Sequence, residues 1–354
     1  MSLRRIFCGL NIVSFVSTNL LKPSLQPIRV MAVKLRRFKG NPILAPRGDD
    51  WEALAVFNCG AIRLGDKIHI LYRAVGDYVR YASSLGHAIL DTNLNVLERS
   101  NRPVLTPSLR LWELSIEDPR ITMIDGEIYV TYVTTITPAP PWPIRRRLGL
   151  PKPQQAYSRC AVASTQDFKE FRRLGPITPY DAEERNLVLF PERFGGRYAA
   201  LHRPINWVGA GYPTDRPGIW FSWLDSIPGV MYDHKLLMKP EQDWERKKIG
   251  AGPPPIKTEK GWLLIYHGVD EDEVYRAGAA LLDLREPWKV VARLPEPILE
   301  PEEDYEKVGD VPNVVFPEGA VLVEDELIVF YGAADKYYCA ASINIGDLLD
   351  EMLR

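Results

Sequence analysis

Short stretches of alternating apolar and polar residues, separated by polar turns, recur along the chain at a regular spacing. The clearest is a six-residue segment that ends on an aromatic residue or histidine and follows a polar two-residue turn. Such alternation predicts a strand with one buried face, and a short turn rich in glycine or aspartate predicts a hairpin. Five copies of the segment align, at residues 67–72, 127–132, 197–202, 261–266 and 326–331.

The spacing of these segments predicts a repeat architecture. Their last residues are separated by 60, 70, 64 and 65 residues, and a regular period indicates repeated structural units. A second strand rich in small residues follows most copies, at residues 82–88, 160–164, 277–280 and 339–342. Three or four strands in each of five units predict an all-β protein folded as a five-bladed β-propeller. A β-sandwich is the alternative, but a sandwich does not require such a period.

The two ends of the chain differ from this pattern. The tail from 347 to 353 is the one segment that reads as a helix. At the other end, Arg4 and Arg5 precede an apolar run over residues 6–16, which weakly imitates a secretory signal and is too short to cross a membrane. Residues 1–30 are therefore expected to be an N-terminal extension, either a mis-assigned start or a signal-like segment, and residues 31–354 the propeller domain.

Composition limits the partners and the kind of site. The chain has 44 basic and 46 acidic residues and a net charge of −2, which provides no global field for nucleic acid, so any anion site must be local. Four cysteines lie far apart and form no CxxC or Cys/His cluster, which argues against a zinc site or a disulfide framework and for a reducing compartment. They are Cys8, Cys59, Cys160 and Cys339.

Candidate chemistry follows from the repeat, because propellers bind ligands on the axis, where equivalent ends of the inner strands converge. Nine residues before each six-residue strand, the equivalent positions hold Asn58, Asp118, Val188, Gly252 and Pro317. Directly after each strand stand Arg73, Val133, Arg203, His267 and Gly332. A shared axial pocket would bring one carboxylate together with several basic or titratable groups.

Asp118 is the candidate acid. Pro119 stiffens the backbone after it, and Arg120 could lower its pKa or hold its charge. An ion pair or turn cap at the start of a strand is the structural alternative. Glu117 should alternate to the other face of an extended segment, so the two carboxylates are not expected to point at one substrate.

The candidate anion-binding groups lie in other parts of the chain. Lys248 ends a basic run that leads into a glycine-bearing loop, where the backbone could approach a ligand closely, although charge runs usually form solvated faces. Arg185 and Asn186 precede a strand, and a planar guanidinium suits oxyanion recognition. His267 could bind an anion or a sugar hydroxyl, but a lone histidine after a strand is more often structural.

Several ordered motifs resemble those of glycoside hydrolase family 130, the mannoside phosphorylases, in the branch that acts on β-1,4-mannooligosaccharides or mannosyl-N-acetylglucosamine. The resemblance covers the chain from about Asn41 to the C-terminus. Its carriers are the residues at 56–58, 71–74, 117–120, 186–192, 201–204, 249–256, 261–269 and 332–335. The family's five-bladed propeller agrees with the repeat.

The resemblance also implies a role for each candidate residue. It implies that Asp118 is the general acid and that its proton passes through the mannose 3-hydroxyl. The phosphate ligands that it implies are Arg185, Asn186, Lys248, His267 and Tyr275. The substrate-binding residues that it implies are Asn58, Arg73, His202, Arg203 and Asp335.

The function implied is inverting phosphorolysis of β-mannosides, which releases α-mannose 1-phosphate and needs inorganic phosphate but no metal or cofactor. Phosphate is already a nucleophile, so one acid plus a basic cluster fits this reaction. An inverting β-mannosidase and a non-catalytic sugar-binding propeller are the alternatives. The resemblance further implies cytoplasmic residence and association into homo-oligomers. The sequence leaves open the acceptor sugar, the linkage and the role of an insertion at 138–155.

Overall fold

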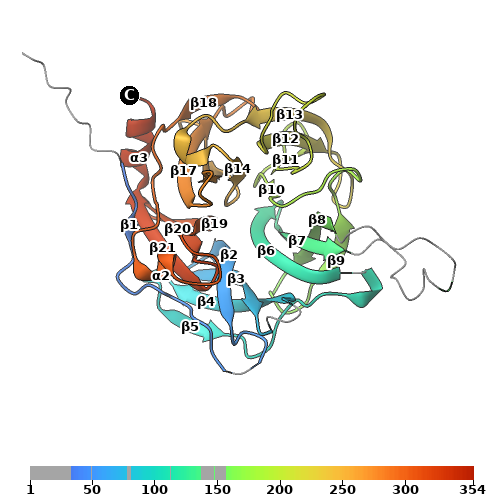
Figure 1. Cartoon of the computed structure of the whole chain (residues 1–354), viewed down its shortest axis with the longest axis vertical. Helices are drawn as coiled ribbons and strands as arrows, with labels where there is room; N and C mark the ends of the chain where they lie inside the picture. Colours follow the sequence, from blue (N-terminus) through green and yellow to red (C-terminus); the bar gives the residue numbers. More distant parts are fainter. Residues whose placement is uncertain (1–32, 49, 78–80, 112, 137–146, 148–156) are drawn as a thin grey trace, which may run out of the picture. The chain divides into compact units, whose positions relative to one another are not determined.

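The computed structural model describes residues 33–48, 50–77, 81–111, 113–136, 147 and 157–354. Within this part of the chain the strands form five antiparallel sheets around a central axis (Figure 1). The predicted all-β, five-bladed β-propeller is therefore confirmed. The N-terminal extension and, apart from residue 147, the insertion at 138–155 lie outside the described residues.

Each of the first three blades is built from four consecutive strands, which follow one another in sequence from the axis outward. Blade 1 contains β2 (Ala55–Leu64), β3 (Lys67–Val75), β4 (Ser83–Asp91) and β5 (Val96–Arg99). Blade 2 contains β6 (Glu113–Ile124), β7 (Glu127–Ile136), β8 (Tyr157–Thr165) and β9 (Arg172–Pro176). Blade 3 contains β10 (Val188–Leu189), β11 (Tyr198–His202), β12 (Ile219–Leu224) and β13 (Tyr232–Met238).

The last two blades vary this plan. Blade 4 contains β14 (Lys248–Ala251) and β15 (Ile256–Lys257), which both pair with β16 (Trp262–Val269), followed by β17 (Tyr275–Leu282) and β18 (Val290–Arg293). Blade 5 contains β19 (Val315–Val323), β20 (Glu326–Ala333) and β21 (Tyr337–Asn344), and its outermost strand is β1 (Arg36–Arg37). The ring is thus closed by pairing the beginning of the propeller with its end.

The repeated six-residue segments fall on the second strand of every blade. The turns before them are tight hairpins where the sequence predicts them: Asp125 and Gly126, both at positive φ, join the paired residues Ile124 and Glu127. Such φ values suit the hairpin turns that match strand twist. The predicted C-terminal helix is α3 (Ile345–Met352), capped by Asn344, whose side chain accepts hydrogen bonds from two backbone N–H groups. Within the described ranges, the other helices are single turns: η1 (Leu109–Leu111), η2 (Asp243–Glu245) and α2 (Asp304–Lys307).

Apolar side chains fill the spaces between neighbouring blades. Phe190 of blade 3 packs edge-on against Trp262 of blade 4, with ring centroids 5.3 Å apart, and both are fully buried. Ile68 of blade 1 and Phe330 of blade 5 share a second cluster across the ring closure. Burial of such a side chain contributes about 1.5–3 kcal/mol to the stability of the fold. The contacts between blades therefore hold the inner strands in fixed positions around the axis.

Four blades share a buried cluster that we call the Tyr-Glu-Arg clamp. A glutamate at or before the innermost strand accepts a hydrogen bond from the tyrosine that ends the six-residue segment. The pairs are Glu52 with Tyr72 (2.9 Å), Glu113 with Tyr132 (3.2 Å), Glu245 with Tyr266 (3.1 Å) and Glu306 with Tyr331 (2.8 Å). An arginine of the outermost strand pairs with each glutamate: Arg99, Arg173, Arg293 and Arg37, respectively. Pairing offsets the cost of burying the carboxylates.

The rings of these tyrosines explain why the third strands carry small residues. Tyr72 lies opposite Gly86, where an added Cβ would come 2.2 Å from the tyrosine ring. Tyr266 lies opposite Gly278, where the corresponding distance is 2.6 Å. The sequence pattern of small residues therefore reflects room left for the clamp.

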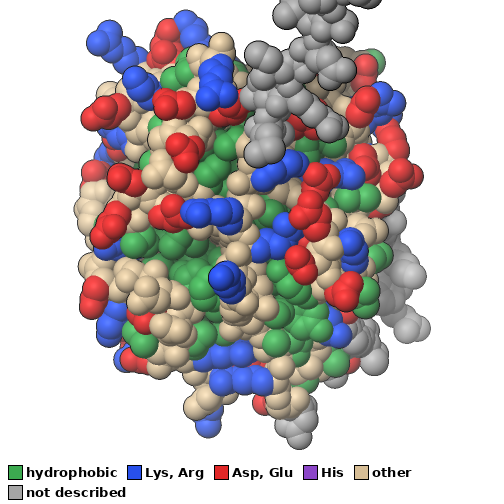
Figure 2. Space-filling view, turned by 90° about the vertical axis from the view of Figure 1, so that its left-hand side faces the viewer, with side chains coloured by type: hydrophobic (Ala, Val, Ile, Leu, Met, Phe, Trp, Pro, Cys, Tyr) green, Lys and Arg blue, Asp and Glu red, His purple; other side chains and the backbone are tan. Residues whose placement is uncertain are grey.

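The surface carries mixed charge. On the face shown in Figure 2, basic and acidic side chains are interspersed, as the net charge of −2 leads one to expect. Cys59, Cys160 and Cys339 are buried free thiols. Among the described residues, none of the helices is long and apolar enough to cross a membrane.

Candidate active site

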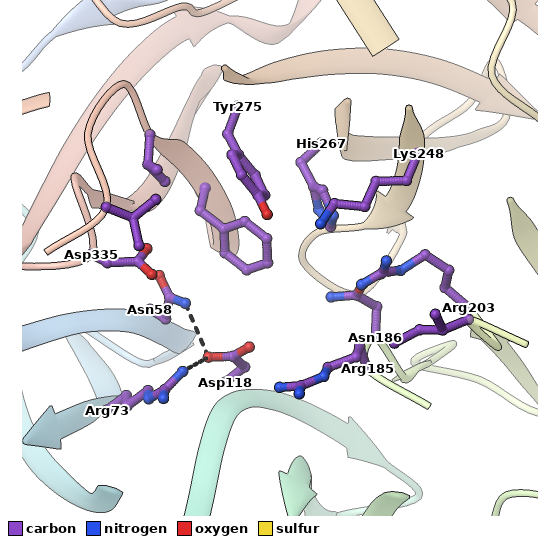
Figure 3. Close-up of a pocket in the computed structure, with 14 residues that line it drawn as sticks. Asn58, Arg73, Asp118, Arg185, Asn186, Arg203, Lys248, His267, Tyr275 and Asp335 are labelled. Carbon is purple, nitrogen blue, oxygen red and sulfur yellow. Dashed lines mark hydrogen bonds and ion pairs between the residues drawn. The ribbon is translucent and has the colours of Figure 1, made fainter. Parts of the chain in front are cut away.

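A pocket of about 330 Å³ opens where the inner strands converge. The residues that line it come from all five blades: from the innermost strands, from the ends of the second strands, from the start of the third strand of blade 4 and from adjoining loops. They are Asn58, Arg73, Asp118, Arg185, Asn186, Arg203, Ile205, Lys248, His267, Tyr275, Val311, Val314, Phe316 and Asp335. In Figure 3, Asp118, Asn58, Arg73 and Asp335 gather on one side, and Arg185, Asn186, Arg203, Lys248 and His267 on the other.

Bulges in the innermost strands aim side chains into this pocket. The ladder of β2 shifts register at Asn58 and that of β6 shifts at Asp118, and both residues have positive φ, at 40° and 51°. A bulge redirects a side chain that strict alternation would place against a neighbouring sheet. Gly332 leaves room for the redirected side chain of Asn58, because a Cβ at position 332 would lie 2.0 Å from the Asn58 amide oxygen.

Asp118 is held as a charged group by its neighbours. Its Oδ1 lies 3.1 Å from Arg73 Nη1 and accepts a 3.0 Å hydrogen bond from Asn58 Nδ2. Burial opposes the charge, but Arg73, Arg120 and the Asn58 amide together hold the pKa of Asp118 below its ordinary value. Asp118 thus forms the ion pair that the sequence offered as the structural alternative to a catalytic acid. The same carboxylate also lines the pocket.

As expected, Asp118 and Glu117 do not both point into the pocket, but strict alternation along the strand is not the reason. Glu117 does not line the pocket, but its Oε2 lies 3.3 Å from the same Arg73 Nη1 and accepts a 3.2 Å hydrogen bond from Arg185. The bulge at Asp118 breaks the alternation on which that expectation rested. Glu117 therefore links arginines from the two sides of the pocket.

Arg120 supports the backbone of the acid more than its carboxylate. Its Nη1 donates to the Asp118 backbone oxygen at 2.8 Å, its Nε donates to the Gly252 carbonyl, and its Nη2 lies 2.8 Å from Glu318. Both Arg120 and Glu318 are buried. Burial raises the pKa of Glu318 well above its ordinary value despite this pairing.

Asp335 supplies a second carboxyl group on the same side. It occupies the turn between β20 and β21 at a φ of 51°. Burial raises its pKa to about 7, the charge on Arg73 opposes that shift, and the charge on Asp118 adds to it. The two aspartates therefore differ in protonation near neutral pH, Asp118 being ionised and Asp335 partly protonated.

The opposite side of the pocket collects hydrogen-bond donors that lack partners. Arg203 donates through Nε to Asn186 Oδ1 at 2.7 Å, which leaves Asn186 Nδ2 buried without a partner among the described residues. Neither ring nitrogen of His267 has a partner there either. Burial, together with Arg203 and Lys248, keeps the pKa of His267 well below its ordinary value. Buried donors are normally satisfied, so this cluster fits an anionic ligand.

Lys248 completes the cationic side. Burial lowers its pKa to about 8, and the charge on Arg203 adds to the effect. Its Nζ lies 5.1 Å from the ring centroid of Tyr275, within the range of a cation–π contact. Gly250, in the same strand, is confined between two of these side chains: a Cβ there would lie 2.5 Å from the His267 ring and 2.6 Å from Asn186 Oδ1.

The structure brings together every site residue proposed from the sequence except one. His202 does not line the pocket; it is buried, and its two ring nitrogens contact Glu184 and Ser222. The prediction that His202 binds the substrate directly is therefore wrong, because its ring points into the blade from the end of β11. Arg203 lines the pocket but lies beside Asn186 on the cationic side, across from Asp335 (Figure 3).

An apolar wall was not anticipated from the sequence. It consists of Ile205, Val311, Val314 and Phe316. The ring of Phe316 lies 4.4 Å from that of His267. The sequence did indicate that Phe316 lies near the site, because it directly precedes Pro317, the position in the repeat that is equivalent to Asn58 and Asp118. In the part of the chain that the structure describes, no three His, Cys, Asp or Glu side chains cluster in a way that could hold a metal ion.

Comparison with known proteins identifies the family. Residues 34–354 match the family model for glycoside hydrolase family 130, described as beta-1,4-mannooligosaccharide phosphorylase. A 1,2-beta-oligomannan phosphorylase from Thermoanaerobacter sp. strain X514 is 36% identical over 89% of this chain and 99% of its own length. A beta-1,2-mannobiose phosphorylase from the same organism is 38% identical over 88% of this chain and 97% of its own.

A solved structure supports the fold. The beta-1,2-mannobiose phosphorylase from Listeria innocua, in complex with beta-1,2-mannobiose, superposes with a TM-score of 0.74 at 24% identity, covering 90% of this chain and 99% of that one. Because the family model and both Thermoanaerobacter relatives match nearly all of the propeller, the chain belongs to glycoside hydrolase family 130, the family of the mannoside phosphorylases.

Proposed function

We propose that this protein cleaves β-linked mannosides with inorganic phosphate, with inversion, and releases α-mannose 1-phosphate. The observation that carries the proposal is the two-sided pocket: the carboxylate of Asp118 faces a cluster of cations and unpartnered donors. Phosphate brings its own nucleophilic oxygen, so the protein has only to position it and offset its charge.

The two sides of the pocket divide the work. Asn58, Arg73 and Asp335 would bind the mannose whose bond is cleaved, and Asp118 would supply a proton through the mannose 3-hydroxyl. Phosphate would be held by the opposite side, made of Arg185, Asn186, Arg203, Lys248, His267 and Tyr275. Because Asp118 is ionised in the free protein, binding of phosphate and sugar must favour its protonated form, as a nearby anion does.

A hydrolase fits this pocket less well. An inverting glycosidase needs a base that activates water on the face of the sugar opposite the acid, with the two carboxyl groups about 6.5–9.5 Å apart. Among the described lining residues, the second carboxylate is Asp335, and it lies on the same side as Asn58 and Asp118 (Figure 3). The opposite side presents donors suited to an anion instead.

For the linkage we propose β-1,2, with β-1,4 as the second candidate. The sequence leaves the linkage open, its resemblance is to the β-1,4 branch of the family, and the matching family model has a β-1,4-mannooligosaccharide phosphorylase as its description. The two Thermoanaerobacter relatives, at 36% and 38% identity over nearly their whole length, are both β-1,2 enzymes. Acceptor sites are built from loops, which vary more than the strands that carry the acid and the phosphate ligands.

The test is to incubate the purified protein with β-1,2-mannobiose and, in parallel, β-1,4-mannobiose, each with and without inorganic phosphate. We expect mannose 1-phosphate only where phosphate is present, and faster release from the β-1,2 substrate. Equal amounts of free mannose with and without phosphate would mean a hydrolase. No product from either substrate would favour the sugar-binding propeller.

Affinity for phosphate is expected to fall as the pH rises through about 8, because Lys248 loses its charge above its pKa of about 8. The KM for phosphate should rise between about pH 7.5 and 9.5, while kcat at saturating phosphate changes less, because the bound anion raises the pKa of the lysine. Lys248→Arg should move the rise to higher pH, since a guanidinium stays charged throughout this range.

Initial rates across this pH range, for the parent protein and the variant, check the prediction. Phosphate itself titrates identically in both experiments, so the difference between the two proteins reports on the lysine. Identical pH profiles of the KM for phosphate would contradict it.

Two expectations remain proposals. We place the reaction in the cytoplasm, because phosphorolysis conserves the energy of the glycosidic bond in a sugar phosphate that is useful inside a cell. Fractionation of the native host, followed by detection of the protein, would check this.

Association into homo-oligomers is expected from the resemblance alone, and light scattering would measure it.

A further inference from the structure

Blade 3 departs from the Tyr-Glu-Arg clamp of the other four blades. Its buried glutamate is Glu184, but the tyrosine is replaced by His202, whose Nδ1 lies 2.5 Å from Glu184 Oε1. Opposite His202 stands Trp220, where the other blades have a small residue. The outermost strand β13 supplies His234 rather than an arginine, and Ser222 bridges the two histidines, with distances of 2.8 Å and 2.6 Å.

The second oxygen of the glutamate also has a different partner in this blade. Glu245 and Glu306 accept backbone N–H groups from the turns directly before them. Glu184 Oε2 instead accepts the backbone N–H of Arg203 at 3.1 Å. The carboxylate therefore joins two segments that are 18 residues apart in sequence.

Those two segments carry much of the cationic side of the pocket. Arg185 and Asn186 directly follow Glu184, and Arg203 directly follows His202. A backbone bridge between Glu184 and Pro204 reinforces the connection, and the 2.7 Å hydrogen bond from Arg203 to Asn186 crosses from one segment to the other.

We propose that the Glu184–His202 pair positions Arg203 and Asn186 for phosphate, so that blade 3 has exchanged a structural clamp for a support of the anion site. The inference rests on the proposed function, in which phosphate binds beside these residues. Both side chains of the pair are fully buried and neither lines the pocket, so they are positioning residues and not ligands. Residues of this kind fix the geometry of the groups that touch the ligand.

The negative charge of Glu184 also favours the charged form of Arg203. Burial lowers the pKa of Arg203 to about 10, and the negative charge of Glu184 opposes that shift. A buried carboxylate also requires compensation. In the other blades an outer arginine provides it, whereas in blade 3 the carboxylate contacts the His202 ring and the Arg203 backbone N–H and interacts with the charge of Arg203.

The experiment measures binding of inorganic phosphate by calorimetric titration, together with the KM for mannoside and the melting temperature. His202→Leu removes both hydrogen bonds of the ring and should weaken phosphate binding about tenfold or more, with little change in the KM for mannoside. His202→Asn, whose amide can replace Nδ1, should restore binding to within about threefold.

Two controls separate positioning from general stability. Tyr132→Phe removes one hydrogen bond from the blade 2 clamp and should lower the melting temperature without changing phosphate affinity. Ser222→Ala leaves His202 Nε2 within 3.3 Å of His234, so it should change phosphate affinity less than about twofold. If His202→Leu fails to fold, Glu184→Gln keeps the shape, removes the charge and should still weaken phosphate binding several-fold.

The outcomes are distinct. A parent protein that binds no phosphate would overturn the proposed function, and this inference with it. A parent protein that binds phosphate, with His202→Leu or Glu184→Gln binding equally well, would overturn the inference alone. Equal weakening by His202→Leu and Tyr132→Phe would show that the pair acts only through stability, and would also overturn it.

Discussion

Asp118→Asn should reduce kcat for phosphorolysis by roughly 10²–10⁴-fold, the usual contribution of a general acid. Asparagine fills the same volume but cannot deliver a proton. The substitution also removes one of the two carboxylates that pair with Arg73 Nη1, leaving Glu117, and places an amide against the Asn58 side chain. The loss should appear in kcat, while calorimetry should show that phosphate still binds, because the cationic side of the pocket is untouched.

The same variant distinguishes the classes of function. A sugar-binding protein would show no turnover in either the parent or the variant form. An enzyme that uses another acid would retain most of its rate in Asp118→Asn, and a kcat within about tenfold of the parent value would reject the assignment.

Arg203→Met should lower kcat/KM for phosphate by roughly 30-fold or more. Removing one partner of a buried, hydrogen-bonded charge costs about 2–5 kcal/mol, and each 1.4 kcal/mol corresponds to about a factor of ten. The substitution also deprives Asn186 Oδ1 of its donor. Since Arg203 lies across the pocket from Asp335 (Figure 3), the KM for mannoside should change much less.

Arg246→Met is the matched control for this prediction. Arg246 belongs to the basic run before Lys248, but its side chain is 64% exposed and pairs with Asp243 at the surface. Exposed pairs contribute about 0–1 kcal/mol, so the control should leave both KM values unchanged. A rise in the KM for mannoside that matches the rise for phosphate in Arg203→Met would instead place Arg203 on the sugar side.

The fold was predictable because its signals are local. Alternation within each six-residue segment and the two-residue turns before it depend on residues adjacent in sequence, and these agree with β3, β7, β11, β16 and β20. The position of Asp118 was also accessible, since counting back from each repeat finds the inner strand. The bulge that turns Asp118 into the pocket was not, because a register shift depends on pairing with β7.

The errors have the same origin. His202 stands in a motif that carries a site residue, Arg203, and only the cross-strand pairing with Trp220 reveals that its ring turns into the blade. The glutamates of the clamps could not be predicted from the repeat, because their separation in sequence from the tyrosine varies between blades. Their function depends on an arginine that, in blade 5, comes from the other end of the propeller, as Arg37 with Glu306 shows.

That last contact bears on the order in which the molecule can be made. Blades 1 to 4 are each encoded by one continuous stretch, so each can form as the chain leaves the ribosome. Blade 5 must wait, because β1 is synthesised first and its partner β21 nearly last. Contacts this distant in sequence are slow to form, and domains fold from the N-terminus during synthesis. We expect a nascent chain that stops before β21 to be an open, protease-sensitive arc, and ring closure to be the late kinetic step.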